Sequence, residues 1–399
     1  MSDMPKLLQI NVTANQGSTG KIAEQVGRLA ISQGWESWIA YGRGVPQSQS
    51  RLIRIGNDLD MRMHGVQSRL LDNHGLASKA VTRHFIEEAR RINPDVIHLH
   101  NIHGYYLNYP LLFDYLKEWG GPVVWTLHDC WPFTGHCAYF MMSGCEKWTT
   151  GCHDCESLRA YPASLLKDGS RRNYELKKNI FTSLGDRLTL VPVSHYVGDY
   201  IGHSFFGDTR CEVIHNGIDI DIFKPCAPKE KLVLGVANVW EPRKGLFDFY
   251  KLRELLPREY KILLVGLTKK QIAGLPEGID GLSRTENQTE LAKLYSKSVA
   301  LANPTYEDNY PTVNLEAIAC GTPVITYRTG GSPESITSDT GVVLEQGDVR
   351  GIADAVLRFE RSRLPSVDDC RTYAVTHFDQ RDCFKAYLEI YDRLRSRLC

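Results

Sequence analysis

The sequence contains two successive series of short, nearly continuous apolar runs, and each series alternates runs with segments of helical spacing. Such runs are typical of parallel strands that helices bury on both faces. The sequence therefore predicts α/β architecture with parallel sheets. The strands expected in the first half are residues 7–12, 37–42, 96–100, 123–128, 188–194 and 212–216.

The pattern restarts after FKPCAPKEK, residues 223–231, whose two prolines and several charges are typical of a linker. We therefore expect two Rossmann-like doubly wound domains, over residues 1–225 and 226–399, and a helix at the C-terminal end. A single TIM barrel is the alternative at this length, and the restart favours two domains. The strands expected in the second half are residues 231–239, 260–266, 300–304, 323–328 and 341–345.

Composition excludes several classes of protein. Basic and acidic residues balance at 47 each, so no overall charge favours nucleic acid. Residues 1–12 lack the features of a signal peptide, and no stretch approaches the ~20 apolar residues of a membrane span. The eleven cysteines are an odd number, and we expect them to be reduced. We expect a cytoplasmic protein.

The loop after the first expected strand, NVTANQGSTGKIA, carries Gly17 directly before a helix. Free backbone N–H groups at a helix N-terminus can hold an anion. The loop matches neither the P-loop nor the GxGxxG pattern. Phosphate contact by Gly17 and a tight turn capped by Ser18 or Thr19 both remain open.

Histidines gather near the ends of two expected strands in the first half. His128 ends the strand 123–128, where an imidazole can bind a phosphate or a sugar hydroxyl. His98 and His100, within the preceding strand, are interpreted mainly as packing residues. His103 lies in the loop that follows them and is a candidate for contact with an acceptor substrate.

The most informative segment is residues 305–334. Asp308 and Asn309 lie in a loop after an expected strand, and Glu316 lies in a helix that begins near Pro311. A helix carboxylate can accept both vicinal hydroxyls of a ribose, and a loop acid can accept a sugar hydroxyl. The sequence therefore predicts a site for a nucleotide and a sugar.

A glycine pair follows the next expected strand. Gly330 and Gly331 offer bare backbone that a diphosphate can approach closely. Two ordinary turns are the structural alternative. The convergence of acids, glycines and helix starts beyond neighbouring strand ends favours a functional site.

The same segment resembles the nucleotide-sugar signature of the retaining glycosyltransferases of family 4, which have the GT-B fold. Members of this family carry an acid, seven residues, Glu-Ala and then a strand similar to CGTPVI. Glu316 matches the second acid and Asp308 the first, with Glu307 beside it. HNGID (residues 215–219), VSHYV around Ser194 and PDVIHLHN match further, and the first half is most similar to transferases of the colanic-acid type.

The resemblance implies two domains with a cleft between them, a UDP- or GDP-sugar donor in the second domain, and a saccharide acceptor, expected to be lipid-linked, in the first. It also implies a retained anomeric configuration and no catalytic metal. The family holds the donor diphosphate with an Arg and a Lys. Lys244 fits the lysine, while Val239 stands at the arginine position, so Arg243 is the candidate replacement.

The expected roles follow from these matches. Glu316 holds the ribose, Asp308 or Glu307 contacts the transferred sugar, and His128 stands at the reacting centre. The remaining expected donor contacts are Gly17, Arg243, Lys244, Asn309, Gly330 and Gly331.

Four cysteines lie within nineteen residues, in HCAYFMMSGCEKWTTGCHDC. Four thiols that end in a CxxC pair indicate a structural zinc site at Cys137, Cys145, Cys152 and Cys155. His136, His153 and Cys130 are alternative ligands, and a loop of reduced cysteines is the metal-free alternative. Four thiolates leave no open position for a catalytic zinc.

Two locally basic regions, residues 61–91 and 167–179, are either lipid-facing surfaces at the inner face of the membrane or solvated helix faces. Two other functions remain open. A sugar-nucleotide epimerase would use the same diphosphate groove, and a non-catalytic scaffold with a zinc-binding loop would bind no nucleotide.

Overall fold

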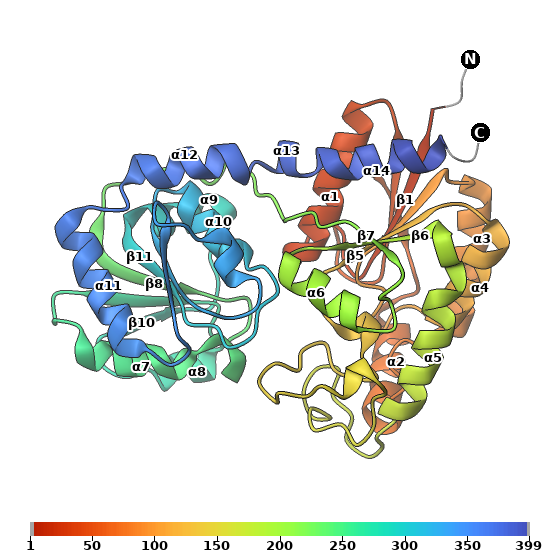
Figure 1. The fold of residues 1–399 in the computed structure, drawn as a ribbon, viewed down its shortest axis with the longest axis horizontal. Helices are drawn as coiled ribbons and strands as arrows, with labels where there is room; N and C mark the ends of the chain where they lie inside the picture. Colours follow the sequence, from red (N-terminus) through yellow and green to blue (C-terminus); the bar gives the residue numbers. More distant parts are fainter. Residues whose placement is uncertain (1–3, 397–399) are drawn as a thin grey trace. The chain divides into compact units, whose positions relative to one another are not determined.

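The computed structural model describes residues 4–396 and divides into two compact units. Unit 1 comprises the chain up to His215 together with the residues from Phe384 onward, and unit 2 comprises Asn216–Cys383 (Figure 1).

Unit 1 contains a seven-stranded parallel sheet in the order β3-β2-β1-β4-β5-β6-β7. The first six strands in this order reproduce the doubly wound 3-2-1-4-5-6 arrangement, and the order reverses between β1 and β4. The strands are β1 (Lys6–Asn11), β2 (Glu36–Tyr41), β3 (Arg51–Arg54), β4 (Val96–Leu99), β5 (Val123–Leu127), β6 (Leu188–Pro192) and β7 (Arg210–Cys211).

Helices cover both faces of this sheet, and local signals in the sequence set their ends. The side chain of Asn108 accepts a hydrogen bond from Leu111 N and begins one helix, which Gly120 ends in the left-handed conformation. The helices are α1 (Gly17–Ser32), α2 (Asp58–Leu71), α3 (Lys79–Ile92), α4 (Tyr109–Trp119), η1 (Trp131–Phe133), η2 (Lys147–Thr149), α5 (Ser170–Phe181), η3 (Thr182–Arg187), α6 (His195–His203) and α14 (Lys385–Arg395).

Unit 2 repeats the arrangement with six parallel strands in the order β10-β9-β8-β11-β12-β13, which reverses between β8 and β11. The strands are β8 (Glu230–Val236), β9 (Lys261–Val265), β10 (Ile279–Leu282), β11 (Ser298–Asn303), β12 (Val324–Tyr327) and β13 (Gly341–Leu344). The helices are η4 (Pro242–Lys244), α7 (Leu246–Leu255), α8 (Lys269–Ala273), α9 (Gln288–Lys297), α10 (Thr312–Ala319), η5 (Ser332–Ser335), α11 (Val349–Ser362), α12 (Val367–His377) and α13 (Gln380–Cys383).

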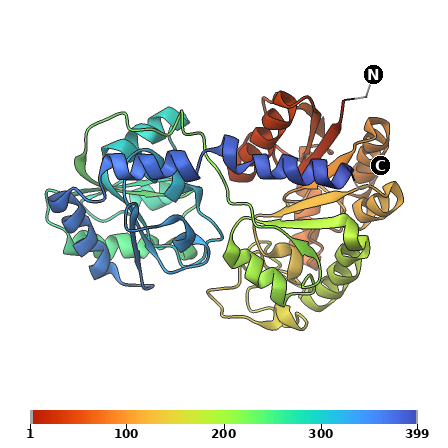
Figure 2. The same cartoon turned by 45° about the horizontal axis from the view of Figure 1, so that its top comes forward.

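The two open sheets confirm the predicted fold class and exclude a single TIM barrel, which needs one closed sheet. The C-terminal helix is also present, but it belongs to unit 1 rather than to the second domain. In Figures 1 and 2 α14 lies against α1. The hydroxyl of Tyr391 in α14 donates a hydrogen bond to His98 (2.6 Å), and the hydroxyl of Tyr387 accepts one from Thr126 (3.0 Å). The last three residues of the expected helix lie outside the described residues.

The units divide after His215, ten residues before the expected boundary at 225. The segment interpreted as a linker is fixed to unit 2 instead. Phe223 is buried, and Arg371 donates hydrogen bonds to the carbonyl oxygens of Phe223 (2.8 Å) and Ile220 (3.0 Å). This segment, rich in proline and charged residues, is therefore part of unit 2 and not a linker between the two units.

The edge strands differ most from the predictions. β3 and β10 were not expected, because β3 is only half-buried and β10 contains Asp280 and Gly281. The strand expected at 212–216 is absent, and β7 ends at Cys211. The backbone N–H groups of Glu212 and Ile214 nevertheless donate hydrogen bonds to the carbonyl oxygens of Leu190 and Pro192 in β6. This segment therefore runs beside the sheet.

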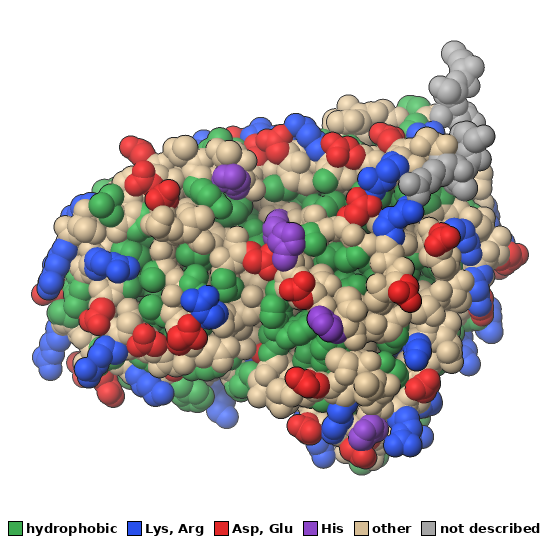
Figure 3. All heavy atoms as spheres, in the orientation of Figure 1, with side chains coloured by type: hydrophobic (Ala, Val, Ile, Leu, Met, Phe, Trp, Pro, Cys, Tyr) green, Lys and Arg blue, Asp and Glu red, His purple; other side chains and the backbone are tan. Residues whose placement is uncertain are grey.

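None of the helices within residues 4–396 is long and apolar enough to cross a membrane. On the face shown in Figure 3, acidic and basic side chains are interspersed on both units. This distribution agrees with the balanced composition.

Candidate functional site

In both units, the predicted site residues lie at the carboxyl edge of a parallel sheet. In unit 2, Lys244 lies in η4 after β8, Asp308 in the loop after β11, and Gly330 in the loop after β12. Because β8 and β11 flank the point where the strand order reverses, these loops border the position at which open sheets bind ligands. The sequence prediction of strand-end loops is thus confirmed for unit 2, and the residue roles stay predictions.

The loops after β8 and β11 are joined by two cations. Lys244 Nζ donates to Asp308 Oδ2 at 2.5 Å, and both side chains are largely shielded, with 17% and 13% of their surface exposed. Arg243 Nη1 donates to the carbonyl oxygen of Glu307 at 3.1 Å, and Arg243 Nε pairs with Glu241 at 3.0 Å. Two positive charges therefore lie beside the predicted sugar-binding acids.

Two glycines allow these loops to approach one another. Gly330 has φ +54°, and a Cβ atom there would lie 1.8 Å from the carbonyl oxygen of Asp308. Gly331 N donates to the same oxygen at 3.3 Å. At Gly245, with φ +71°, a Cβ atom would lie 2.1 Å from the carbonyl oxygen of Pro304. Only glycine fits both positions, since each combines positive φ with backbone contact.

Glu316 lies in the second turn of α10. Its Oε2 accepts a hydrogen bond of 2.9 Å from the hydroxyl of Tyr295, which is fully buried on α9. This bond holds the carboxylate from one side and fixes its rotamer. A carboxylate held in this way suits recognition of two vicinal hydroxyls, as expected from the sequence.

A buried polar network supports the acidic loop, and the sequence analysis missed it. The side chain of Asn314 accepts from Asn303 Nδ2 (2.9 Å) and donates to Ser332 Oγ (3.0 Å) and Ser335 Oγ (3.1 Å). Ser332 Oγ is also 2.7 Å from Thr326 Oγ1. The network joins β11, α10, β12 and η5. Asn303, a polar residue at the end of a largely apolar strand, could have indicated this network, because buried polar groups need hydrogen-bond partners.

A second support comes from α7. The buried carboxylate of Asp248 accepts hydrogen bonds from the hydroxyls of Tyr306 (2.8 Å) and Tyr327 (3.0 Å). Tyr306 N in turn donates to the carbonyl oxygen of Arg243 at 2.7 Å. The loops after β8 and β11 and the end of β12 are thus tied to one helix.

At the carboxyl edge of the unit 1 sheet, three side chains form a hydrogen-bonded chain. His128 Nε2 lies 3.1 Å from His100 Nδ1, and His100 Nε2 lies 3.1 Å from Gln9 Oε1. The amide of Gln9 is oriented by its Nε2, which donates to the carbonyl oxygen of Ala23 at 2.8 Å. Gln9 and His100 are buried.

This chain assigns the tautomers. Gln9 Oε1 can only accept, so His100 carries its proton on Nε2 and accepts at Nδ1. His128 therefore donates from Nε2, and its Nδ1 is the unprotonated nitrogen. Burial lowers the pKa of His128 to about 4, and burial also holds the pKa of His100 well below its usual value. Both rings are neutral at physiological pH.

His103, expected to contact the acceptor, is buried in unit 1. Its Nε2 lies 2.9 Å from Asp129 Oδ2, and its Nδ1 lies 3.1 Å from the hydroxyl of Tyr161. Both ring nitrogens are thus engaged inside the unit. Direct contact with an acceptor would require one of these bonds to break.

Gly17 is the first residue of α1 and is exposed, with φ +65°. A Cβ atom there would meet no atom within 4 Å, so this helix end faces open space. The alternative cap by Ser18 or Thr19 is wrong, because both lie inside the helix and the N-cap is Gln16. Thr19 Oγ1 instead accepts from Asn11 Nδ2 at 3.3 Å.

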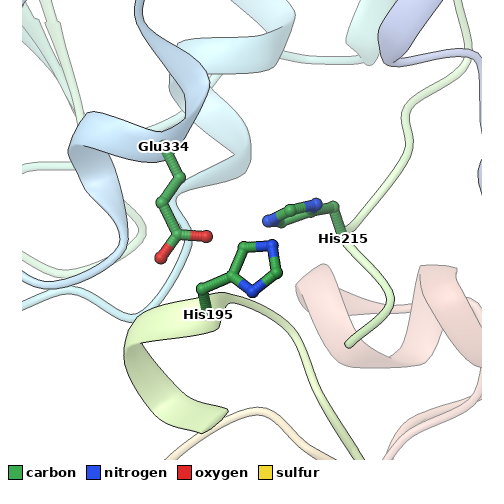
Figure 4. Close-up of side chains that lie close together, drawn as sticks. All are labelled: His195, His215 and Glu334. Carbon is green, nitrogen blue, oxygen red and sulfur yellow. The ribbon is translucent and has the colours of Figure 1, made fainter. Parts of the chain in front are cut away.

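Two more histidines of unit 1 follow β6. His195 begins α6 directly after Ser194, which caps this helix, and its ring centroid lies 5.4 Å from that of His215 (Figure 4). Glu334, also drawn in Figure 4, belongs to η5 of unit 2. The motifs around Ser194 and His215 were noted in the sequence without a role for either ring.

A surface cavity of about 520 Å³ lies elsewhere in unit 1, beside Asp95, Gly121 and Arg395. Asp95 and Gly121 come just before β4 and β5, so this cavity is at the amino edge of the sheet. It is therefore separate from the strand-end loops described above.

Two family descriptions match the chain in succession. Residues 32–222 match Glycosyltransferase Family 4, and residues 218–377 match Glycosyl transferases group 1. The second match contains every candidate donor-binding residue of unit 2. The two matches together span most of both units.

A curated relative shares nearly the whole length. The Escherichia coli (strain K12) protein WcaC, named as a colanic acid biosynthesis glycosyl transferase, is 26% identical over 362 residues, which cover 86% of this chain and 88% of that protein.

Solved structures share the fold at low sequence identity. A sucrose-phosphate synthase from Thermosynechococcus elongatus superposes with a TM-score of 0.73 and 16% identity, covering 98% of this chain and 100% of that one. Anabaena HepE in complex with UDP-glucose superposes with a TM-score of 0.68 and 13% identity, covering 97% and 99%. With the family matches, these findings show that the chain belongs to the family 4 glycosyltransferases with the GT-B fold.

Proposed function

We propose that this enzyme transfers a sugar from a UDP- or GDP-sugar to a saccharide acceptor, with retention of the anomeric configuration. The bond between the sugar C1 and the diphosphate oxygen breaks, a bond from C1 to an acceptor hydroxyl oxygen forms, and the proton of that hydroxyl passes to the departing diphosphate. The observation that carries the proposal is the pairing of Lys244 with Asp308 at the carboxyl ends of β8 and β11.

The donor site is assigned to unit 2. Lys244 and Arg243 supply positive charge where a diphosphate would lie, and charge-assisted hydrogen bonds to phosphate are among the stronger ones in proteins. Glu316 accepts the ribose hydroxyls, and Asp308 or Glu307 accepts a hydroxyl of the sugar. Asn309, Gly330 and Gly331 complete the donor loops.

The main chemical task is to stabilise the charge that develops on the departing diphosphate. In unit 2 we assign this task to Lys244, Arg243 and the backbone N–H groups near Gly330, without a catalytic metal. His128 is assigned to the reacting centre as a neutral imidazole. A neutral imidazole can exchange a hydrogen bond with a sugar hydroxyl.

The acceptor is assigned to the class of growing cell-surface polysaccharides, and to lipid-linked ones in particular. The name of WcaC, which refers to colanic acid biosynthesis, supports this class. HepE was solved with UDP-glucose, which supports a nucleotide-sugar donor. We assign the enzyme to the cytoplasm, where nucleotide sugars are used, with peripheral contact to the inner face of the membrane.

The surface of unit 1 supports the membrane contact. Leu59, Met63, Val66 and Leu70 are exposed and recur along one face of α2. Exposed Arg62 and Arg69 lie on the same helix. An apolar stripe flanked by arginines is typical of helices that lie in the interface of an anionic bilayer.

The two basic regions noted in the sequence are also neighbours in the structure. Leu165 N donates to the carbonyl oxygen of Arg69 at 2.6 Å, and Arg172 Nη2 donates to that of Asp72 at 2.9 Å. Leu166, which is 77% exposed, therefore lies near the C-terminal end of α2. This adjacency extends the apolar and basic surface.

Sedimentation with vesicles tests the membrane contact. We expect the protein to sediment with phosphatidylglycerol vesicles and not with phosphatidylcholine vesicles, and Val66→Asp to weaken sedimentation. Val375→Asp, at an exposed apolar position of α12 in unit 2, is the matched control. Equal loss in both variants, or no sedimentation of the unmodified protein, would refute the contact.

A turnover assay tests the transferase activity itself. The protein is incubated with UDP- and GDP-sugars, with and without membrane extract that contains lipid-linked saccharides, and the products are separated by chromatography. Release of UDP or GDP that depends on the extract supports sugar transfer. A sugar-nucleotide isomer formed without extract indicates the epimerase, and no turnover under any condition indicates the non-catalytic scaffold.

A further inference from the structure

Unit 1 contains a long segment with little regular structure. Between β5 and α5, residues 128–169 form two short 3-10 turns, η1 and η2, and otherwise loops (yellow in Figure 1). Segments of this length without helices or strands are uncommon in compact domains. Such a segment has few backbone hydrogen bonds to hold it, so it benefits from another cross-link.

The four cysteines of the CxxC-containing motif all lie in this segment. Cys152 Sγ accepts a hydrogen bond of 3.2 Å from Gly135 N. Cys145 and Cys152 are partly buried and pack against the core of unit 1. All four cysteines therefore belong to one loop segment of unit 1, between β5 and α5.

A buried lysine lies under this region. Lys177 of α5 is buried, and its Nζ donates to the carbonyl oxygens of Trp131 (2.7 Å) and Thr134 (3.0 Å). Burial lowers the pKa of Lys177 to about 7, and negative charge on Cys152 and Cys137 would raise it. Four thiolates around one Zn²⁺ carry net negative charge, and a buried cation compensates it.

His136 is the neighbouring group that most resembles a metal ligand. Its Nδ1 lies 2.7 Å from Asp72 Oδ1, and both side chains are buried. Within the described residues, His136 Nε2 is a buried nitrogen without a hydrogen-bond partner. His153 is less suited, because its side chain is 46% exposed and its Nδ1 pairs with Asp154.

We propose that Cys137, Cys145, Cys152 and Cys155 bind a structural Zn²⁺ ion. Tetrahedral Zn²⁺–thiolate sites have Zn–S distances of about 2.3 Å. Among residues 4–396, no three of these sulfur atoms lie within 4.8 Å of one another, so the proposal requires the loop to bring them closer together when the ion binds. Its role is to cross-link residues 137–155 and to fix them on the core of unit 1.

Metal analysis of the full-length protein tests the proposal. Protein purified without chelators is measured by inductively coupled plasma mass spectrometry, and the bound ion is then released with a mercurial thiol reagent. We expect one zinc per chain, released together with the modification of four thiols. A protein without zinc that also fails to take up added Zn²⁺ would overturn the proposal, as would a disulfide that consumes these cysteines.

Variants identify the ligands. We expect Cys152→Ser and Cys145→Ser to lose most of the zinc, while Cys226→Ser, at an exposed cysteine of unit 2, keeps it. We also expect His136→Gln to keep the ion. Loss of zinc in His136→Gln and its retention in Cys145→Ser would contradict the four-cysteine site.

Cobalt substitution keeps the test valid if a cysteine variant fails to fold. Unmodified protein depleted of zinc is titrated with Co²⁺, and its absorption spectrum is recorded. Tetrahedral thiolate ligation predicts intense ligand-field bands and a sulfur-to-cobalt charge-transfer band that saturate at one Co²⁺ per chain. Weak bands typical of six oxygen or nitrogen ligands would refute the site.

Discussion

Lys244 and Asp308 lie 64 residues apart in the sequence, and in the structure Lys244 Nζ donates to Asp308 Oδ2 at 2.5 Å. The pair joins the loops after β8 and β11, and both side chains are largely shielded from solvent. In the proposed reaction the lysine binds the donor diphosphate and the aspartate binds the sugar. When the donor binds, the hydrogen bond between Lys244 and Asp308 is therefore replaced by two others: one from Lys244 to the diphosphate and one from the sugar to Asp308.

The exchange predicts opposite effects on nucleotide binding. Lys244→Ala removes a charge-assisted bond to phosphate, so we expect UDP or GDP to bind about 10- to 100-fold more weakly. Asp308→Asn removes the carboxylate that competes for Lys244, so we expect nucleotide affinity to stay equal or rise while turnover falls. Calorimetry and a turnover assay measure the two quantities.

The control for this pair is Lys293→Ala, at an exposed lysine of α9 in the same unit. We expect it to change neither quantity. If Lys244→Ala binds the nucleotide as tightly as Lys293→Ala does, Lys244 does not contact the diphosphate.

A second prediction concerns the loop after β12. Gly330→Ala places a Cβ atom against the carbonyl oxygen of Asp308 in a left-handed backbone conformation. We expect unit 2 to lose about 1–3 kcal/mol of stability, and nucleotide binding to weaken because the acidic loop moves. Chemical denaturation measures the first effect. Gly274→Ala, where a Cβ atom meets its nearest neighbour at 3.6 Å, should behave like the unmodified protein.

The histidine chain of unit 1 gives a third prediction. Gln9→Leu removes the acceptor that holds the His100 proton on Nε2, so we expect the proton to move to Nδ1 and the His128 tautomer to change with it. Nitrogen-15 chemical shifts of the imidazoles report the tautomers directly, and turnover should fall.

Ser37→Ala is the control for this chain, because it removes another buried hydrogen bond of the same sheet, from Ser37 to Ser50 at 2.9 Å. We expect it to leave the His128 shifts unchanged. Unchanged shifts in Gln9→Leu would show that Gln9 does not set the tautomer.

A fourth prediction is acid sensitivity of unit 1. Burial lowers the pKa of His64 to about 4 and holds those of His74 and His98 well below their usual value. Because these rings are neutral when folded and have pKa values near 6.5 when unfolded, unfolding takes up protons below pH 6.5. Stability is therefore full above pH 6.5 and falls toward pH 4, by up to about 1.4 kcal/mol per pH unit for each ring.

Denaturation curves at several pH values measure this slope. His64 Nε2 accepts a hydrogen bond of 3.1 Å from Gly75 N, so protonation of this nitrogen breaks a buried contact. We expect His64→Gln to make stability less dependent on pH between 6.5 and 4. An unchanged slope in this variant would contradict the prediction for His64.

The central strands and the strand-end loops were predictable because they depend on local sequence patterns. Continuous apolar runs marked β1, β4, β5 and β6, and acids and glycines after such runs marked the loops of unit 2. The edge strands β3 and β10 were not predictable from this signal, because a strand at the edge of a sheet is less buried and less apolar.

Contacts between distant residues were beyond a single sequence. Gln9 and His100 are 91 residues apart, and nothing in either local pattern indicates that they pair. His98 lies in an apolar strand, and its partner Tyr391 comes from the C-terminal helix, which the sequence placed in the other domain. Buried polar residues signal that a partner exists, but only the fold shows which one it is.

Calorimetric titration with UDP and with GDP measures nucleotide binding to the donor site of unit 2. It compares unmodified protein with Glu316→Ala and with Tyr295→Phe, which removes only the hydroxyl that orients the Glu316 carboxylate. We expect micromolar binding of one nucleotide, a large loss in Glu316→Ala and a smaller loss in Tyr295→Phe. Binding of neither nucleotide to the unmodified protein, or equal binding to Glu316→Ala, would contradict the donor site in unit 2.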